Sequence, residues 1–118
     1  MVHFRFENLD IWKMAIEIGD ELFDIADMLE EKKLFRFAEQ LRGAGMSISN
    51  NISEGSGSYS DKDFGNFLKF SRRSVYECAN ILVIVERRKL IKTEYKKELF
   101  EKLAHLSKKI TNFRKTLI

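Results

Sequence analysis

The chain has 118 residues, the size of one domain, so we expect a single core formed by residues 1–118. Hydrophobic residues make up 44% and charged residues 33%, a balance typical of soluble globular proteins rather than disordered ones. Proline is absent and there are only six glycines, so the turn signals of a many-stranded β protein are missing. One cysteine excludes a disulfide-rich scaffold. The composition predicts an all-α fold.

The charges are divided unevenly along the chain. The formal net charge is +3, from 21 Lys and Arg against 18 Asp and Glu. Residues 1–59 carry 6 basic and 11 acidic side chains, whereas residues 60–118 carry 15 basic and 7 acidic ones. Such a split can reflect solvated helix faces, packing between the halves, association between chains, or a basic surface for a polyanion.

Nothing in the sequence predicts secretion or membrane attachment. The lone Cys78 fits a reducing compartment. The N-terminus lacks the long apolar core of a signal peptide, and the longest aliphatic run, residues 81–85, is far too short to cross a bilayer. We therefore expect a cytoplasmic protein.

The first predicted helix covers residues 8–29 and carries two apolar stripes. Because one stripe suffices for packing on one neighbour, the second predicts burial on two sides. The charged run at residues 30–33 ends the pattern. The first stripe consists of Leu9, Trp12, Ile16, Phe23 and Ala26, with Gly19 in the same row, and the second of Ile11, Ile18 and Ile25.

Two more helices are predicted at residues 34–54 and from residue 60 to residue 88. Gly55 is placed to end the former in the left-handed conformation. Ser60 with Asp63 resembles a capping box at the start of the latter. The expected inward residues are Leu34, Phe37, Leu41, Ala44, Ile48 and Ile52 on the first of these helices, and Phe64, Phe67, Leu68, Val75, Cys78, Leu82 and Val85 on the next.

A fourth helix is predicted from Thr93, a plausible N-cap. Its apolar residues follow the 4-3-4-3-4 spacing of a coiled-coil-like seam. Since three short connections force neighbouring helices to run antiparallel, we expect an up-down-up-down antiparallel four-helix bundle. The seam consists of Leu99, Leu103, Leu106, Ile110, Phe113 and Leu117.

No catalytic, cofactor or metal site is predicted. A nucleophilic triad usually needs a histidine beside its nucleophile, and the chain has only His3 and His105. The paired Glu-x-x-His motifs of di-iron bundles are absent. The glycine-rich residues 55–58 lack the Gly-Lys-Ser/Thr ending of a phosphate loop and are interpreted as a turn. We expect a protein that is not an enzyme.

Polar residues form a stripe beside the apolar seam of the second helix. Ser71, at the same three-residue spacing, extends a matching row on the third helix. Short polar side chains at such a border usually hydrogen-bond across helices, because leaving them buried and unpaired costs about 1–3 kcal/mol each. We expect a structural network here, with a ligand site as the alternative. The predicted network consists of Gln40, Ser47, Asn51, Glu54, Ser74 and Glu77.

Within this stripe the sequence becomes similar to a known family. Residues 42–55 resemble the signature R-x-A-x-x-S-I-x-x-N-I-x-E-G of the "four helix bundle protein" family, also called the 23S rRNA intervening-sequence protein family. Residues 6–15 resemble its opening pattern F-x-x-L-x-V/I-W-x-x-A, and residues 64–68 and 74–77 resemble its third helix. The chain departs from the family at Arg73, where glycine is usual, and so adds positive charge at this position.

The resemblance implies an up-down-up-down bundle that assembles as a ring-like homopentamer. Members are encoded in insertions within bacterial 23S rRNA genes or elsewhere in bacterial genomes. They are similar to the accessory proteins of diversity-generating retroelements, which bind nucleic acid and a reverse transcriptase through a basic surface. The biochemical role of most members is not established.

Two functions follow from these observations. The first is binding of RNA or DNA by an oligomer, because closely spaced cations suffice to hold phosphates and assembly repeats each weak patch. We expect no stacking platform for bases, since most of the ten Phe fall at core positions. The alternative is a protein-interaction scaffold whose charge asymmetry serves subunit contacts. The candidate binding residues are Lys69, Arg72, Arg73, Arg87, Arg88, Lys89, Lys92, Lys96 and Lys97.

Overall fold

The fold, a computed structural model that describes residues 1–118, contains four α-helices and no strand. The all-α prediction is confirmed, and each predicted helix boundary lies within two residues of the observed one. A short 3-10 turn, η1, precedes the helices. The elements are η1 (Arg5–Asn8), α1 (Asp10–Glu31), α2 (Phe35–Ser56), α3 (Asp61–Arg87) and α4 (Thr93–Lys115).

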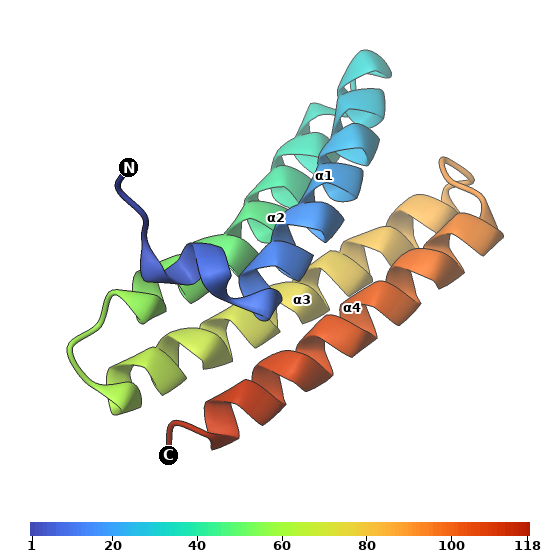
Figure 1. The fold of residues 1–118 in the computed structure, drawn as a ribbon. Coiled ribbons are helices and arrows are strands. Elements are labelled where there is room, and N and C mark those ends of the chain that lie inside the picture. Colours follow the sequence, from blue (N-terminus) through green and yellow to red (C-terminus); the bar gives the residue numbers. More distant parts are fainter.

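The helices pack as a bundle in which α2 and α3 form the central contact. Helix α1 packs against α2 and α4 against α3, while α1 and α4 also touch. Figure 1 shows the α1–α2 pair and the α3–α4 pair diverging toward their loop ends. No helix is both long enough and apolar enough to span a membrane.

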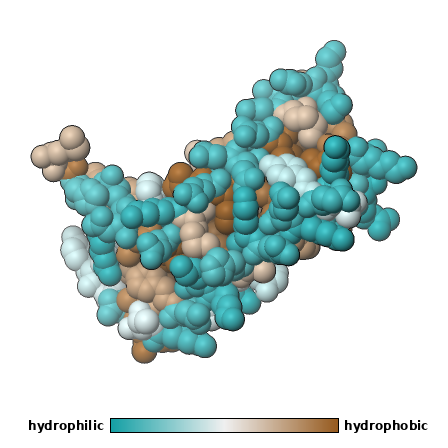
Figure 2. Space-filling view, turned by 45° about the vertical axis from the view of Figure 1, so that its right-hand side comes forward, coloured by the Kyte–Doolittle hydropathy of each residue, from teal (hydrophilic) through white to brown (hydrophobic).

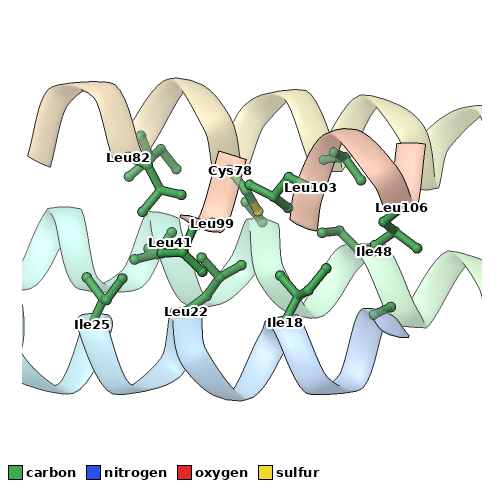
Figure 3. Packing of buried hydrophobic residues seen from close by; sticks show 14 of the residues in the cluster. Ile18, Leu22, Ile25, Leu41, Ile48, Cys78, Leu82, Leu99, Leu103 and Leu106 are labelled. Atoms are coloured by element: carbon green, nitrogen blue, oxygen red, sulfur yellow. The ribbon is translucent and has the colours of Figure 1, made fainter. Parts of the chain in front are cut away.

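The core consists of 23 buried hydrophobic side chains from all four helices. Figure 3 shows Leu22 of α1, Leu41 of α2, Leu82 of α3 and Leu103 of α4 directed into the same interior. The apolar seams predicted for α2, α3 and α4 are buried or packed against this core, as their periodicity indicates, except for Phe67 of α3, which is half-buried outside it.

The prediction that α1 is buried on two sides is only partly confirmed. The stripe of Ile11, Ile18 and Ile25 enters the core, together with leucines and alanines between its members. On the other stripe Ile16 is 37% exposed and Trp12 is half-buried. The helix therefore buries one side within the chain and leaves part of a second apolar stripe at the surface.

The left-handed residues that end helices are not where the sequence predicts them. Gly55 lies inside α2 with a negative φ, so its predicted left-handed cap is wrong. The left-handed residues are instead Lys33 and Lys89, with φ of 63° and 61°. Each is followed by a leucine whose N–H donates to the carbonyl five residues earlier, Leu34 to Leu29 and Leu90 to Val85, as in a Schellman cap.

The N-terminal ends of α3 and α4 also differ from each other. The Ser60 side chain accepts a hydrogen bond from the Asp63 N–H at 3.1 Å, so the predicted cap of α3 is confirmed. The predicted N-cap Thr93 is wrong, because Lys92 occupies that position without a side-chain cap. Thr93 is the first helical residue, and its Oγ1 donates to Glu86 Oε2 at 3.1 Å.

Candidate nucleic-acid interface

The uneven charge of the sequence is distributed over different helices. Helix α1 carries eight acidic residues and one basic residue, whereas α4 carries seven basic and three acidic residues. Residues 64–76 of α3 and residues 102–118 at the C-terminal end contain several basic residues and no acidic one, whereas residues 40–53 of α2 also lack acidic residues but carry only Arg42. Unbalanced positive charge therefore gathers where the α3 stretch and the C-terminal stretch meet.

They meet along a groove between α3 and α4. Its main hollow has a volume of about 540 Å³ and an apolar floor that includes Val75, Leu103 and Ala104. Arg72 and Lys108 are among the charged residues of its lining, none of which is acidic. Two further hollows share Arg72 with it, one of about 560 Å³ that is lined by α3 alone and a smaller one of about 230 Å³. We call this surface the basic groove; its cations are Lys69, Arg72, Arg73, Lys108, Arg114 and Lys115.

Local contacts hold several of these cations in place. The Nη2 of Arg72 lies 3.3 Å from the Tyr76 hydroxyl, and its guanidinium carbon lies 4.9 Å from the centre of the Tyr76 ring. The Nε of Arg114 donates to the carbonyl of Gly65 at 3.1 Å, which ties the end of α4 to the start of α3. None of the six cations forms a salt bridge within the chain, so their charges are available to an external anion.

Other cations of the chain are already neutralised. Lys102 Nζ lies 2.8 Å from Glu21 Oε2, and this hydrogen bond raises the pKa of Lys102. Arg42 contacts Asp27 at 2.6 Å and Glu30 at 2.9 Å, and its pKa is raised by these two partners in that order. The Lys102–Glu21 pair joins α4 to α1, and the Arg42 pairs join α2 to α1. These cations therefore contribute to contacts between helices.

The structure divides the nine predicted binding residues between the middle of α3 and the α3–α4 connection. Lys69, Arg72 and Arg73 lie together in the basic groove. The other six lie at the α3–α4 connection, about 24 Å away, since Arg72 and Arg88 are 16 residues apart at 1.5 Å per residue. The latter group consists of Arg87, Arg88, Lys89, Lys92, Lys96 and Lys97.

The connection differs from the groove in its acidic neighbours. The hollow at the connection is lined by Glu86 and Glu94 as well as by cations. Lys96 Nζ lies 3.9 Å from Glu86 Oε1 and 4.7 Å from the centre of the Phe100 ring. This end of the molecule is therefore more nearly balanced in charge than the basic groove.

Sequence reasoning missed the contribution of α4 to the groove. Lys108, Arg114 and Lys115 join Arg72 only through the packing of α4 against α3. The available signal was the absence of any acidic residue after Glu101, combined with the expected pairing of the last two helices.

The placement of the phenylalanines differs in part from the prediction. Of the ten, only Phe64 is fully buried, whereas Phe4, Phe35 and Phe70 are exposed. In the basic groove Phe70 is 50% exposed and Tyr76 is 59% exposed. On the face seen in Figure 2, hydrophobic residues likewise reach the surface between hydrophilic ones. Most of the ten Phe are buried or half-buried, as expected, but two aromatic rings are exposed in the basic groove.

Three members of the predicted polar network do meet at the α2–α3 contact. The hydroxyls of Ser47 and Ser74 are hydrogen-bonded at 2.8 Å, and Asn51 Nδ2 donates to the Ser47 carbonyl at 2.8 Å and to its hydroxyl at 3.0 Å. The fully buried Ser71 hydroxyl donates to the Ile48 carbonyl at 2.8 Å, so it extends the same contact.

The other three residues of that network lie elsewhere. Gln40, Glu54 and Glu77 are exposed and make no side-chain hydrogen bond, so they are not part of it. Every buried side-chain nitrogen or oxygen has a partner within the chain. The hydrogen bonds that Ser47, Asn51, Ser71 and Ser74 make therefore support the structural interpretation of the α2–α3 contact.

Gly55 serves the same α2–α3 contact. A Cβ at this position would lie 2.7 Å from Phe67 Cβ and 2.8 Å from Phe64 Cδ1. Only glycine allows α2 and α3 to approach this closely at the end of α2. The block from Ser47 to Gly55 is thus explained by helix packing, with the exception of Glu54, which nothing in the structure explains.

Reactive groups do not gather anywhere in the molecule. No three His, Cys, Asp or Glu side chains lie close enough to hold a metal ion. His105 is exposed on α4. Burial, and to a smaller extent the neighbouring Glu77, raise the pKa of the Cys78 thiol to about 12, so the thiol is unreactive at neutral pH.

Comparison with known proteins agrees with this architecture. The fold resembles a crystal structure of a protein of unknown function from the S23 ribosomal protein family of Bacteroides thetaiotaomicron, with a TM-score of 0.83 and 23% sequence identity. The match covers 89% of this chain and 98% of that one. No curated protein sequence matches the chain. The profile of the 23S rRNA-intervening sequence protein family matches residues 7–112, and the chain therefore belongs to this family.

Proposed function

We propose that this protein is a non-enzymatic, oligomeric protein that binds RNA or DNA through the basic groove. The observation that supports this most is the set of six cations in one groove that form no internal salt bridge and whose lining contains no acidic residue. Ordinary solvated helix faces mix both signs of charge, as α4 itself does between Glu94 and Glu101. A surface with one sign of charge is the electrostatic footprint expected for a polyanion.

Binding would come mainly from phosphate contacts. Each phosphate that a Lys or Arg neutralises releases condensed counterions, and contributes about −0.9 on duplex DNA or −0.7 on a single strand to the slope of log affinity against log salt. The six cations come from two packed helices, so they form a fixed array. Such contacts position a nucleic acid without reading its sequence.

Assembly would strengthen this weak binding. We propose that copies of an up-down-up-down bundle form a ring-like homopentamer, so that one nucleic acid meets several grooves and gains avidity without new contacts. Support comes from α1, where Ile16 is exposed and Trp12 half-buried, and from Met46 of α2, which is 53% exposed. Large side chains of this kind at the surface are typical of interaction sites.

Two variants with the same change in charge test the groove. We expect Lys69→Glu/Arg72→Glu/Arg73→Glu to weaken binding of RNA and DNA uniformly across sequences and to flatten the salt slope. The matched variant Arg87→Glu/Arg88→Glu/Lys89→Glu, at the α3–α4 connection, should have a smaller effect on both. Fluorescence anisotropy over a salt titration gives both quantities, and no binding by the wild type at low salt would contradict the proposal.

A protein-interaction scaffold is the second candidate, and the charge of α1 favours it. The net charge of α1 is −7, opposite in sign to that of the groove, so a neighbouring subunit could satisfy the groove instead. In that case the first triple variant would dissociate into smaller species, and light scattering would show a mass closer to the 13.9 kDa of one chain.

A further inference from the structure

Two aromatic rings in the basic groove lie outside the hydrophobic core. Phe70 and Tyr76 lie on α3 six residues apart, and each exposes at least half of its surface. The other large apolar residues of α3 that enter the core, such as Phe64 and Leu68, are essentially inaccessible to solvent. Both exposed rings therefore leave a large apolar surface in water at the place where the chain concentrates positive charge.

Each ring carries an arginine beside it. The guanidinium of Arg72 lies over Tyr76 at 4.9 Å, and that of Arg73 lies over Phe70 at 5.9 Å from the ring centre. Guanidinium planes and aromatic faces are the two surfaces on which proteins stack unpaired bases. Arg73 and Phe70 thus form one platform, and Arg72 and Tyr76 form another.

The hollow next to Tyr76 combines an apolar floor with a cationic lining. Val75, Ala79 and Ala104 line the floor beside the Tyr76 ring, in a volume of about 540 Å³. That volume lies within the range of small-molecule pockets, so it can hold a planar base. Arg72, Lys108 and Lys115 also line the hollow, where they can meet the phosphates on either side of that base.

An acidic helix of a protein would match the cations but would leave the flat faces of the two rings without a flat partner. A duplex would match the cations as well, but its base faces are buried in the stack. Building on the proposed function, we infer that the basic groove selects single-stranded over double-stranded nucleic acid, stacking unpaired bases on Tyr76 and Phe70 while the surrounding cations hold the phosphates.

The test compares labelled oligouridylate with an RNA duplex of the same length, at one salt concentration, by fluorescence anisotropy. The wild type should bind the single strand more tightly. Tyr76→Leu and Phe70→Leu, which stay apolar but cannot stack, should each weaken single-strand binding by about tenfold and leave duplex binding and the salt slope unchanged. Tyr76→Trp should retain the preference.

Control variants separate stacking from charge and from folding. Phe35→Leu removes an equally exposed ring at the start of α2, outside the groove, and should change nothing. Lys108→Gln should weaken both probes, because phosphates are common to both. Oligouridylate carrying 2-aminopurine should report stacking as fluorescence quenching that Tyr76→Leu abolishes.

The outcomes distinguish this inference from the proposed function. If neither probe binds at low salt, the proposed function fails and the inference with it. If both probes bind and Tyr76→Leu weakens both equally or neither, only the inference fails. If Tyr76→Leu instead lowers the assembled mass in light scattering, the ring belongs to a contact between copies and the inference is overturned.

Discussion

Helix α3 presents two faces with opposite character. Toward α2 it offers Ser71 and Ser74, which hydrogen-bond across a contact so close that Gly55 cannot carry a side chain. Toward solvent and α4 it offers Arg72 and Tyr76, which have no partner beyond each other and the groove. The comparison shows that side chains of one helix divide between those that hold it against α2 and those that stay at the surface of the groove.

The largest effect is expected where the inner face is tightest. Gly55→Ala would place a methyl group within 3 Å of Phe64 and Phe67, and should lower the free energy of unfolding by about 2–3 kcal/mol through overpacking. The matched variant Gly43→Ala, whose Cβ meets nothing within 4 Å, should raise it by about 0.5–1 kcal/mol. Urea denaturation measures both, and equal effects would contradict the packing account of the signature.

A smaller loss is expected from the hydrogen bonds of the same contact. Asn51→Leu removes the donor to Ser47 and should lower the free energy of unfolding by about 1–2 kcal/mol, because its partners are left unsatisfied. Gln40→Leu on the exposed part of α2 should change it by less than about 0.5 kcal/mol. An Asn51→Leu variant that melts like the wild type but binds RNA poorly would assign the asparagine to a ligand site instead.

The effect with no consequence at neutral pH concerns the buried Cys78 and is confined to alkaline solution. Folding raises the pKa of its thiol from the ordinary 9.0 to about 12, so the thiol is protonated in both states below pH 9 and adds no pH dependence there. Above pH 9 the unfolded chain loses this proton first, and the free energy of unfolding falls as the pH rises toward 12. We expect Cys78→Ala to show a shallower decline over this range, measured by denaturation at a series of pH values; equal slopes would contradict the burial effect.

The sequence predicts the helices and most of the core because both depend on local periodicity. Three- and four-residue spacing defines the seam from Leu99 to Ile110, and Ser60 caps α3 through a residue only three positions away. The role of Gly55 is mispredicted from the sequence. A glycine near a helix end can either cap the helix or allow a neighbouring helix to approach closely, and only the position of that neighbour decides between the two roles.

The candidate site is harder to predict, because it is assembled between helices. Lys108 and Lys115 are more than 35 residues from Arg72 in sequence, and they meet it only after α4 packs on α3. The exposure of Tyr76 and of Ile16 likewise depends on where neighbours are absent, which periodicity does not encode. Counting charges along the chain therefore gives equal weight to the groove and to the α3–α4 connection, although only the connection contains acidic residues.

The most direct measurement compares the neighbouring residues Ser71, which is buried, and Arg72, which is exposed, in both stability and nucleic-acid binding. Ser71→Ala should lower the free energy of unfolding by about 1 kcal/mol and leave the Kd for oligouridylate unchanged, because the buried hydrogen bond to Ile48 is lost and the groove is untouched. Arg72→Ala should change stability by less than about 0.5 kcal/mol but weaken binding severalfold. If both variants shift stability and binding together, or if Arg72→Ala leaves the Kd unchanged, the separation of the two faces is contradicted.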